Sequence, residues 1–417
     1  MSKFIIQGGK KLSGEIRVAG SKNAMFPLFA AALLTKEECR FTNVPAIKDR
    51  EVIVDLIRDL GAEVTVSGDE VWIKAVNLKK TGLDSVLAAK LRGSIVLLGA
   101  LLGREKSASM VFPGGDLIGK RPIDSHLSAF QKLGARVMVA DGIKIEATAL
   151  IGTKIVLEES SVTATENIVL AACRAEGLTT IKLAAMEPHV QQLCEFLNLM
   201  GAKIFGIGTP TVIIEGVAKL HGAQVRIIPD SNEAASLITL ASATKSDITV
   251  SGLNPDFLDD FLLKLSQMKV KFEIGNDFVH VLPPAEAYKA TKIQCGLYPK
   301  LASDDMPTLA VLATQAAGES LIYEWLYENR LGYVDQLKKM GAKADILDPH
   351  RVKIIGPVAL KGAKIESLDI RMGMTMVIAA LVADGQSEIA GVEHIDRGYE
   401  RLEERLQALG ADIKRIG

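Results

Sequence analysis

Leu60-Gly61-Ala62 follows an apolar helical pattern and precedes a short strand-like segment. Near copies of this tripeptide recur at Leu133-Gly134-Ala135, Met200-Gly201-Ala202, Met268-Lys269-Val270, Met340-Gly341-Ala342 and Leu409-Gly410-Ala411. The first residues of successive copies are 73, 67, 68, 72 and 69 residues apart. A nearly fixed period indicates one supersecondary unit repeated along the chain. The sequence therefore predicts six copies of a single α/β unit.

Each repeat is expected to contain a buried helix, an amphipathic helix and short strands. The first helix is apolar almost all round, as is typical of a helix buried on all sides; the six runs are 24–34, 93–102, 168–172, 234–241, 308–316 and 375–382. The second helix, such as 49–60 or 190–200, has apolar residues at three- and four-residue spacing. The glycine after five of these helices suits a helix end, because left-handed geometry costs glycine little.

The length and composition fit two domains of three repeats each. The chain has 417 residues, of which 48% are apolar and 24% charged, an ordinary balance for a globular protein. We expect two α/β domains of pseudo-threefold symmetry, with the buried helices inside and the sheets and amphipathic helices outside.

Charge, cysteines and hydropathy exclude several classes of partner. The net charge of −1 gives no general basic field for nucleic acid or anionic lipid. The four cysteines show no CxxC spacing, so we expect buried, reduced thiols in a cytoplasmic protein. The first residues lack the apolar core of a signal peptide, and the longest apolar run, 94–102, is far shorter than the roughly 20 residues that span a bilayer.

Polar residues recur at or just before the start of each buried helix. They are Ser21-Lys22-Asn23, Lys90-Leu91-Arg92, residues 161–167, residues 230–233, Asp304-Asp305 and Asp369-Ile370-Arg371. Equivalent positions in a pseudo-threefold domain point in one direction, so these helix starts are expected to open onto one interdomain cleft. Ser, Asp and Asn serve there in part as N-caps. Cations are disfavoured at a positive helix end unless an anion compensates, so Lys22, Arg92 and Arg371 predict an anion site.

A loop between two repeats has an unusual composition. Residues 112–124 read Phe-Pro-Gly-Gly-Asp-Leu-Ile-Gly-Lys-Arg-Pro-Ile-Asp, with three glycines and two prolines, which is typical of a shaped, mobile loop. The P-loop pattern is absent, because Arg121 follows Lys120 where a hydroxyl residue is needed. Asp116 is expected at the loop apex within reach of Arg121, although a solvated turn would be the default for this loop by itself.

Ordered motifs across the repeats carry a family resemblance. They are Gly20-Ser21-Lys22-Asn23-Ala24, Leu91-Arg92-Gly93-Ser94, Pro113-Gly114-Gly115 with 118–124, Tyr327-Glu328-Asn329-Arg330, Leu368-Asp369-Ile370-Arg371 and residues 394–401. Together they resemble the UDP-N-acetylglucosamine 1-carboxyvinyltransferases, enolpyruvyl transferases of peptidoglycan synthesis, from about residue 5 to the C-terminus.

The resemblance implies a fold and a reaction. The fold would be two inside-out α/β domains of three βαβαββ-like units each, spanning 22–229 and 1–21 plus 230–417, with the active site in the interdomain cleft. The reaction would transfer the enolpyruvyl group of phosphoenolpyruvate to the 3′-hydroxyl of UDP-N-acetylglucosamine by addition and elimination. Phosphate would be released without a metal or bound cofactor. The sequence leaves the oligomeric state open.

The resemblance also implies residue roles. Lys22, Arg121 and Arg397 would hold the phosphate and carboxylate of phosphoenolpyruvate, and Arg330 and Arg371 would line the same pocket. The residues bordering the UDP-sugar would be Asn23, Arg92, Arg121, Pro122, Ile123, Asp124, Ser125, Ser161, Val162, Thr163 and Leu326. Asp305 would take the 3′-hydroxyl proton, and Asp369 would lie close to the reacting carbons. Such an addition needs an acid and a base at opposite ends of one site.

Asp116 stands where most members carry Cys, although some natural members carry Asp. A model Cys titrates near roughly 8.5 and a model Asp near roughly 3.9, so an Asp is a poor acid at neutral pH unless its surroundings raise the pKa. We expect Asp116 to hold a proton, or share one with the substrate phosphate, in the closed complex. Fosfomycin, which alkylates the usual thiol, is then expected to leave this protein active.

Two alternatives are open. A 5-enolpyruvylshikimate-3-phosphate synthase would share the fold and the donor, but the long Asp116 loop and residues 395–399 resemble the UDP-sugar branch. A non-catalytic UDP-sugar-binding regulator is expected to have lost Asp305, Lys22 or Arg397, and all three are present. Smaller departures from the family, at His189, Met372 and Met374 and in residues 307–309, bear on the shape of the pocket and on the exact sugar acceptor, and for His189 a structural role is the alternative to ligand contact.

Overall fold

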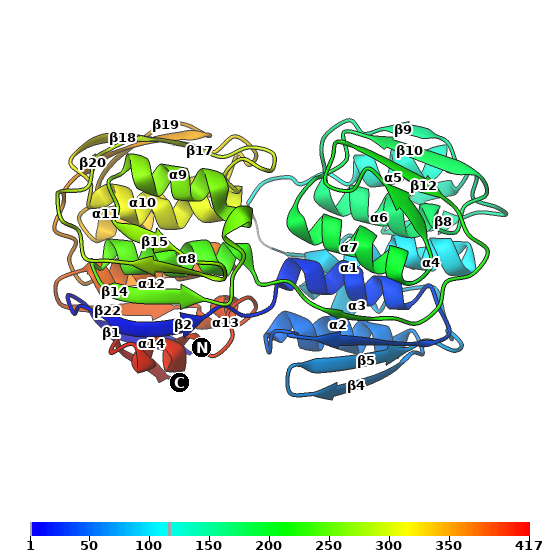
Figure 1. Ribbon diagram of the computed structural model, residues 1–417, viewed down its shortest axis with the longest axis horizontal. Coiled ribbons are helices and arrows are strands. Elements are labelled where there is room, and N and C mark those ends of the chain that lie inside the picture. Colours follow the sequence, from blue (N-terminus) through cyan, green and yellow to red (C-terminus); the bar gives the residue numbers. More distant parts are fainter. Residues whose placement is uncertain (1, 116–117) are drawn as a thin grey trace. The chain divides into compact units, whose positions relative to one another are not determined.

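The structure is a computed structural model that describes residues 2–115 and 118–417 (Figure 1). The described residues form two compact units. The terminal unit, which holds both chain ends, contains residues 2–19, 118–120 and 229–417. The central unit contains residues 20–115 and 121–228.

The terminal unit has three buried helices and three four-stranded sheets. Its helices are α8 (Ser231–Ala243), α9 (Asp259–Gln267), α10 (Met306–Thr314), α11 (Tyr333–Lys339), α12 (Ile370–Val382), α13 (Val392–Ile395) and α14 (Leu402–Ala408), with 3₁₀ turns η2 (Pro255–Leu258), η3 (Ser303–Asp305) and η4 (Arg330–Gly332). Its strands are β1 (Lys3–Gln7), β2 (Ser13–Arg17), β14 (Asp247–Ser251), β15 (Phe272–Ile274), β16 (Phe278–Val281), β17 (Lys292–Gln294), β18 (Gly318–Tyr323), β19 (Lys343–Asp348), β20 (Arg351–Gly356), β21 (Lys364–Glu366), β22 (Gln386–Ala390) and β23 (Asp412–Ile416). The sheet orders are β21-β22-β1-β23, β15-β16-β14-β2 and β17-β18-β20-β19.

The central unit repeats this design. Its helices are α1 (Lys22–Ala32), α2 (Lys48–Asp59), α3 (Ser85–Lys90), α4 (Leu97–Glu105), α5 (Asp124–Lys132), α6 (Val162–Ala172) and α7 (Pro188–Leu199), with the 3₁₀ turn η1 (Arg92–Val96). Its strands are β3 (Glu38–Thr42), β4 (Glu63–Ser67), β5 (Glu70–Lys74), β6 (Ser107–Met110), β7 (Arg136–Val139), β8 (Ile143–Glu146), β9 (Lys154–Val156), β10 (Leu178–Lys182), β11 (Lys203–Phe205), β12 (Thr211–Glu215) and β13 (Gln224–Arg226). The sheet orders are β13-β3-β5-β4, β11-β12-β10-β9 and β6-β8-β7.

The order of elements confirms the predicted βαβαββ unit. In the repeat β9-α6-β10-α7-β11-β12, β9 pairs parallel with β10, and β12 pairs antiparallel with both β10 and β11. In the last repeat the N-terminal strand β1 completes the sheet, because it pairs antiparallel with β22 and β23. The sheet of β6, β7 and β8 has three strands, and a single parallel bridge from Gly82 to Ser109 marks the place of a fourth.

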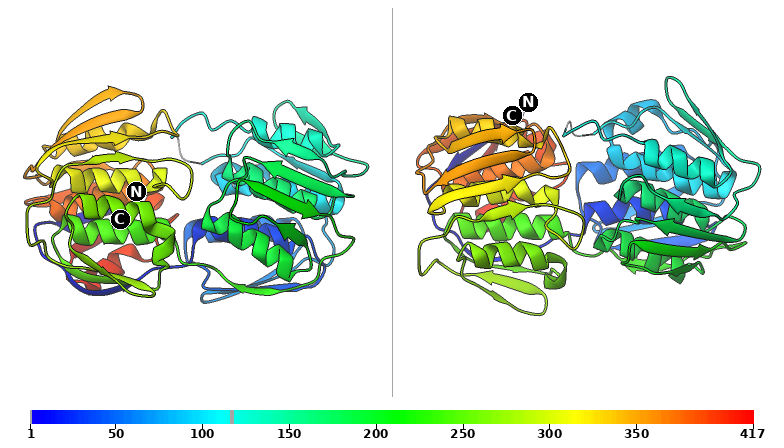
Figure 2. Two further views of the ribbon diagram at one scale, coloured as in Figure 1. Left: turned by 45° about the horizontal axis from the view of Figure 1, so that its top comes forward. Right: turned by 90° about the horizontal axis from the view of Figure 1, so that it is seen from above.

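The cores confirm the prediction that the apolar helices are buried. In the terminal unit α8, α10 and α12 contact one another (Figure 2). Every residue of α10 is buried. In the central unit the three buried helices are α1, α4 and α6. Nearby, the Phe41 ring packs in tilted pairs against Phe29 and Phe196, with ring centroids 4.9 and 5.4 Å apart. Within the described chain, no helix has both the length and the apolarity to cross a membrane.

The sixfold tripeptide is a helix end with left-handed backbone at its second residue. The glycines at positions 61, 134, 201, 341 and 410 have φ between 93 and 103°. In the repeat without glycine, Lys269 adopts φ 64° at the same place. The backbone geometry is therefore conserved among the repeats even where the side chain disfavours it.

The four cysteines are buried and free, as predicted. Burial raises the pKa of the Cys39 thiol to about 11 and the pKa values of Cys194 and Cys295 to about 12. Because the thiolate is the reactive form, these thiols are structural.

Candidate active site

Polar residues at the starts of the buried helices act as N-caps. The Ser21 and Ser161 hydroxyls accept the amides of Ala24 and Ala164 at 3.3 and 3.4 Å. The Asp230 carboxylate accepts the amide of Glu233 at 2.9 Å. Asp369 accepts two amides at the start of α12, those of residues 371 and 372, at 2.8 and 2.9 Å. The predicted capping role is confirmed, and one Asp369 oxygen is committed to it.

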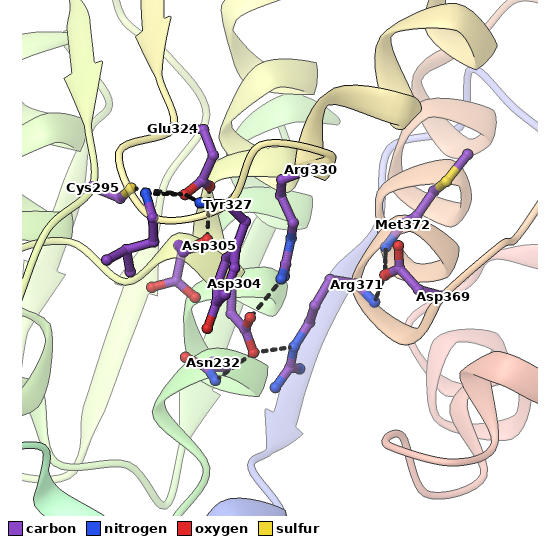
Figure 3. Close-up of polar contacts among 12 residues, drawn as sticks. Asn232, Cys295, Asp304, Asp305, Glu324, Tyr327, Arg330, Asp369, Arg371 and Met372 are labelled. Carbon is purple, nitrogen blue, oxygen red and sulfur yellow. Dashed lines mark hydrogen bonds and ion pairs between the residues drawn. The ribbon is translucent and has the colours of Figure 1, made fainter. Parts of the chain in front are cut away.

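Asp304 organises a charged cluster in the terminal unit (Figure 3). Its Oδ1 accepts a hydrogen bond from Arg330 Nη2 at 2.7 Å, and its Oδ2 accepts one from Arg371 Nε at 2.8 Å. Asn232 Nδ2 also donates to Oδ2 at 3.2 Å. The side chains of Arg330 and Arg371 are 3% and 8% exposed, and that of Asp304 is 29% exposed. One carboxylate thus orients two guanidinium groups that arrive from different repeats.

Tyrosine rings support both arginines. The Arg330 guanidinium lies over the Tyr327 ring at 5.7 Å, and that of Arg371 lies over the Tyr399 ring at 5.8 Å. Arg371 Nη1 also donates to the Tyr399 hydroxyl at 3.2 Å. Guanidinium groups bind carboxylates and phosphates through planar, paired donors, so fixing the plane restricts the direction in which an anion is bound.

Asp305, the neighbour of Asp304, lies in a different environment. Its side chain is buried, and among the described residues its Oδ1 has no hydrogen-bond partner. Burial and the Asp304 charge raise the pKa of Asp305 well above its usual range, and Arg371 opposes them. At Asp304 burial is outweighed by Arg371 and Arg330, which hold the pKa of that carboxyl well below its usual range. A carboxylate with a raised pKa and a vacant acceptor atom is suited to accept a proton.

Glu324 shapes the segment between β18 and Arg330. Its Oε1 accepts the amides of Leu326 and Tyr327 at 2.9 and 3.2 Å. Its Oε2 accepts a hydrogen bond from the hydroxyl of Ser303, the residue directly before the Asp304–Asp305 pair, at 2.7 Å. Leu326, predicted to border the UDP-sugar, is exposed. This buried carboxylate ties the Leu326 turn to the start of α10.

The described end of the Asp116 loop contacts this same segment. Residues 118–120 belong to the terminal unit, and the Lys120 amide donates to Glu328 Oε1 at 3.1 Å. The Asn329 amide donates to the carbonyl of Ile118 at 3.2 Å. Asp116 itself lies outside the described residues.

Lys22 begins α1 in the central unit and is paired with a carboxylate. Its Nζ lies 2.6 Å from Asp49 Oδ2, and the two side chains are 11% and 3% exposed. Asn23, the next residue, is half-buried. Asp49 and Asp304 supply compensation within the chain for Lys22 and Arg371, two of the cations at the helix starts. The anion site expected at these helix starts stays a prediction.

Arg92 is joined to the loop that precedes α5. Its Nη2 donates to the carbonyl of Arg121 at 2.5 Å, and Arg121 has a left-handed backbone with φ 47°. The loop also packs closely at Gly114, where an added Cβ would lie 1.6 Å from the carbonyl oxygen of Ala89. The residues that follow Arg121 have graded exposure: Pro122 and Asp124 are exposed, Ile123 is half-buried and Ser125 is buried.

The start of α6 places the last predicted group. Ser161, Val162 and Thr163 are half-buried in its first turn. The Thr163 hydroxyl lies 3.1 Å from Nε2 of the buried His126. The sequence predicts a buried apolar run from residue 168, whereas α6 begins at Val162. The polar residues 165–167 of this helix are buried as well, so the buried part of α6 starts before the apolar run.

The structure thus gathers the predicted residues into groups within each unit. Arg330, Arg371 and Asp305 lie around Asp304 in the terminal unit. In this unit Arg397 is half-buried after α13. Asp369 and Leu326 also belong to the terminal unit, and the central unit holds Lys22, Asn23, Arg92, 121–125 and 161–163. The expected convergence of Lys22, Arg121 and Arg397 stays a prediction.

Several residues of these groups had no assigned role in the sequence argument. The sequence indicates Asp304 only as a polar residue at a helix start, because its pairing with two arginines leaves no local signal. Asp49, Glu324 and His126 were missed, because each acts through a contact with a residue that is distant in the sequence.

Comparisons with known proteins give a consistent result. The family described as EPSP synthase (3-phosphoshikimate 1-carboxyvinyltransferase) matches residues 6–406. A UDP-N-acetylglucosamine 1-carboxyvinyltransferase of Borreliella burgdorferi is 42% identical, with 100% of this chain and 99% of that protein covered. The protein of the same name from Halothermothrix orenii is 40% identical, with both chains fully covered at 100%.

Solved structures show the same architecture. The enolpyruvyl transferase NikO from Streptomyces tendae has a TM-score of 0.90 at 25% identity, covering 99% of this chain and 98% of that one. An EPSP synthase from Acinetobacter baumannii has a TM-score of 0.79 at 20% identity over 100% of both chains, a likeness of fold.

Proposed function

This chain belongs to the EPSP synthase (3-phosphoshikimate 1-carboxyvinyltransferase) family of enolpyruvyl transferases, and we propose that it transfers the enolpyruvyl group of phosphoenolpyruvate to the 3′-hydroxyl of UDP-N-acetylglucosamine. The relatives that carry this activity in their names are about 40% identical over the whole chain. Phosphate is the second product. In the cell the reaction serves peptidoglycan synthesis in the cytoplasm.

The observation that carries the proposal is the Asp304–Asp305 pair with its two arginines. The cluster of Asp304, Arg330 and Arg371 has one carboxylate and two guanidinium groups, so it retains one net positive charge for an anionic substrate. Asp305, next to it, has a raised pKa and one oxygen without a hydrogen-bond partner among the described residues, which suits it to accept a proton. Addition of a hydroxyl group across the double bond of phosphoenolpyruvate needs both a cationic site that binds the anionic substrate and a base that accepts the hydroxyl proton.

The donor and acceptor need further cations and donors. Lys22, Arg121 and Arg397 are proposed to bind the phosphate and carboxylate of phosphoenolpyruvate, where charge-assisted hydrogen bonds are strong. Asn23, Arg92, the segments 122–125 and 161–163 and Leu326 are proposed to bind the UDP-sugar. Asp369 is proposed to lie near the reacting carbons.

The acid of the reaction is proposed to be Asp116. In the addition step Asp305 removes the proton of the 3′-hydroxyl as its oxygen bonds to C2 of phosphoenolpyruvate, and Asp116 delivers a proton to the methylene carbon. In the elimination step a proton returns from that carbon to the Asp116 carboxylate, the C2–O bond to phosphate breaks, and the proton taken from the hydroxyl leaves with the inorganic phosphate. The enol ether product and inorganic phosphate balance the two substrates.

The test measures inorganic phosphate released from phosphoenolpyruvate with each acceptor. We expect release with UDP-N-acetylglucosamine and none above background with shikimate 3-phosphate. Release with shikimate 3-phosphate alone would reassign the chain to the EPSP synthase activity. Binding of UDP-N-acetylglucosamine by calorimetry without any phosphate release would identify a UDP-sugar-binding regulator instead.

A further inference from the structure

A chain of hydrogen bonds runs through the core of the central unit to Thr163. It begins at the amide of Gly99 in the first turn of α4, where helix amides lack a partner within the helix. That amide donates to Asn167 Oδ1 at 2.6 Å, which fixes the orientation of the Asn167 side chain. Asn167 Nδ2 then donates to the carbonyl of Ile95 at 3.0 Å and lies 2.9 Å from Nδ1 of His126.

The orientation of Asn167 determines the tautomer of His126. Since Asn167 presents an N–H to Nδ1, Nδ1 is the acceptor nitrogen of the imidazole. A neutral ring with an unprotonated Nδ1 carries its hydrogen on Nε2, and this N–H donates to the Thr163 hydroxyl oxygen at 3.1 Å. His126 is 1% exposed, and burial together with the nearby charge of Arg92 lowers its pKa to about 3, so the ring stays neutral at physiological pH.

The Thr163 hydroxyl therefore has its own hydrogen left to donate. Its oxygen is occupied by His126, and no described residue accepts the hydroxyl hydrogen of Thr163. The hydroxyl of Thr165, two residues further along α6, has partners for both roles. It donates to the carbonyl of Ser161 at 2.8 Å and accepts a hydrogen bond from the Ala185 amide at 3.0 Å. Thr165 is satisfied by the protein, whereas Thr163 is half-buried with an uncommitted donor.

We propose that His126 and Asn167 are positioning residues that hold the Thr163 hydroxyl as a hydrogen-bond donor to an acceptor oxygen of the UDP group. This inference rests on the proposed function, in which Thr163 borders the UDP-sugar. The first turn of α6 offers amide donors beside the hydroxyl, and phosphoryl oxygens are acceptors without hydrogens. Without His126, the hydroxyl could rotate and present its lone pairs to the same oxygen, which is repulsive.

The test compares Thr163→Val, Thr163→Ser, His126→Phe and the double variant Thr163→Val/His126→Phe in the full chain. Calorimetry measures the Kd for UDP and for UDP-N-acetylglucosamine, and phosphate release gives KM for each substrate. We expect Thr163→Val to raise both Kd values about tenfold, the factor for one lost hydrogen bond, with Thr163→Ser restoring most of the affinity. His126→Phe should have a similar effect alone and less than about a twofold effect in the Thr163→Val background.

The outcomes separate the two proposals. If the unmodified protein releases phosphate but Thr163→Val binds UDP with unchanged affinity, the inference fails and the proposed function stands. Independent effects of the two substitutions would also overturn it, because a positioning residue acts only through Thr163. If the unmodified protein neither binds the UDP-sugar nor releases phosphate, both proposals fail.

A spectroscopic measurement covers the case in which His126→Phe does not fold. Nitrogen-15 NMR of the unmodified protein distinguishes the two neutral tautomers of His126. We expect hydrogen on Nε2 and no titration of the ring between pH 5 and 9. Hydrogen on Nδ1 would overturn the proposal, because Thr163 would then be the donor to His126 and its hydrogen would be committed.

Discussion

Asp304 and Asp305 are neighbours in the chain, yet their carboxyl groups lie in opposite electrostatic environments. Asp304 accepts hydrogen bonds from Arg330 and Arg371 and is held as an anion. Asp305 is buried beside that anion, and both the burial and the neighbouring charge raise its pKa. Its Oδ1 has no hydrogen-bond partner among the described residues. Two adjacent carboxyls whose environments push their pKa values apart are suited to different roles, one as a holder of charge and one as a base.

Asp305→Asn is predicted to lower turnover strongly without unfolding the protein. The substitution removes a proton acceptor worth roughly 10²- to 10⁴-fold in rate, and it leaves a neutral side chain of the same shape at a buried site. Because burial raises the pKa of Asp305, the rate of the unmodified protein should rise with pH through a value above that of an ordinary Asp. Steady-state phosphate release between pH 5 and 9 measures both effects, and turnover of Asp305→Asn within tenfold of normal would exclude Asp305 as the base.

Asp304→Asn is predicted to destabilise the fold by about 3 kcal/mol at pH 7, because two guanidinium groups lose their anionic partner. The lower part of the range for buried pairs applies, since the Asp304 side chain is 29% exposed. The folded pKa of Asp304 is lowered, so its contribution is present above the ordinary Asp value of roughly 3.9 and is lost as pH falls below it. Urea unfolding at pH 7 and pH 3 should therefore show a smaller gap between the two proteins at pH 3, and a larger gap there would contradict the charge assignment.

The repeat was predictable from the sequence because each copy ends in a helix terminus that needs left-handed backbone. Gly61 and its equivalents leave a local mark that can be counted, and the apolar runs identify the buried helices. The start of α6 was missed, because Thr165, Glu166 and Asn167 are buried polar residues that interrupt the apolar pattern. Their burial depends on partners such as His126 and Ala185, which lie in other elements.

The candidate site could be predicted only in part. Capping residues such as Ser161 and Asp369 were visible, because a cap acts within a few residues of itself. The pairing of Arg371 with Asp304 joins residues 67 positions apart, and that of Lys22 with Asp49 joins two helices. Such contacts are made by tertiary packing, so residue type and spacing do not indicate them.

Asp116→Cys is predicted to retain phosphate release and to become sensitive to fosfomycin, whereas Asp116→Ala should lose nearly all activity. A cysteine thiol is protonated at pH 7 and can therefore deliver a proton, whereas an alanine side chain has no acidic proton to deliver. The epoxide needs a nucleophilic thiol, and the four native cysteines are buried. Intact mass after treatment should show one adduct on Asp116→Cys and none on the unmodified protein. An adduct on the unmodified protein, or full activity of Asp116→Ala, would remove Asp116 from the mechanism.

Glu166→Gln is predicted to increase stability at alkaline pH. Burial, with the nearby Glu187 carboxyl, raises the pKa of Glu166 well above its usual range. The folded protein thus keeps a proton that the unfolded chain releases above roughly pH 4.3, and the associated stability is lost as pH rises toward the folded pKa. The unfolding free energy of Glu166→Gln relative to the unmodified protein should grow between pH 5 and 8, by at most about 1.4 kcal/mol per pH unit. Glu195→Gln, at an exposed position of α7, is the matched control and should show no such growth with pH. A stability difference between Glu166→Gln and the unmodified protein that shrinks as pH rises would contradict a raised pKa of Glu166.

Lys269→Gly is predicted to stabilise the terminal unit by about 0.5 to 1 kcal/mol. Lys269 has φ 64°, a conformation that costs a non-glycine residue roughly 1 to 2 kcal/mol, and glycine returns part of the gain through the greater entropy of the unfolded chain. The side chain contributes little, because its Nζ lies 3.9 Å from Glu286 and both side chains are more than half exposed. Gly341→Ala is the reverse experiment: an added Cβ meets no atom within 4 Å, so the expected loss of about 1 kcal/mol comes from the backbone alone. Urea unfolding of both variants, with Lys269→Ala to isolate the side chain, should give shifts of opposite sign. Shifts of the same sign would show that left-handed backbone is not what the repeated glycine provides.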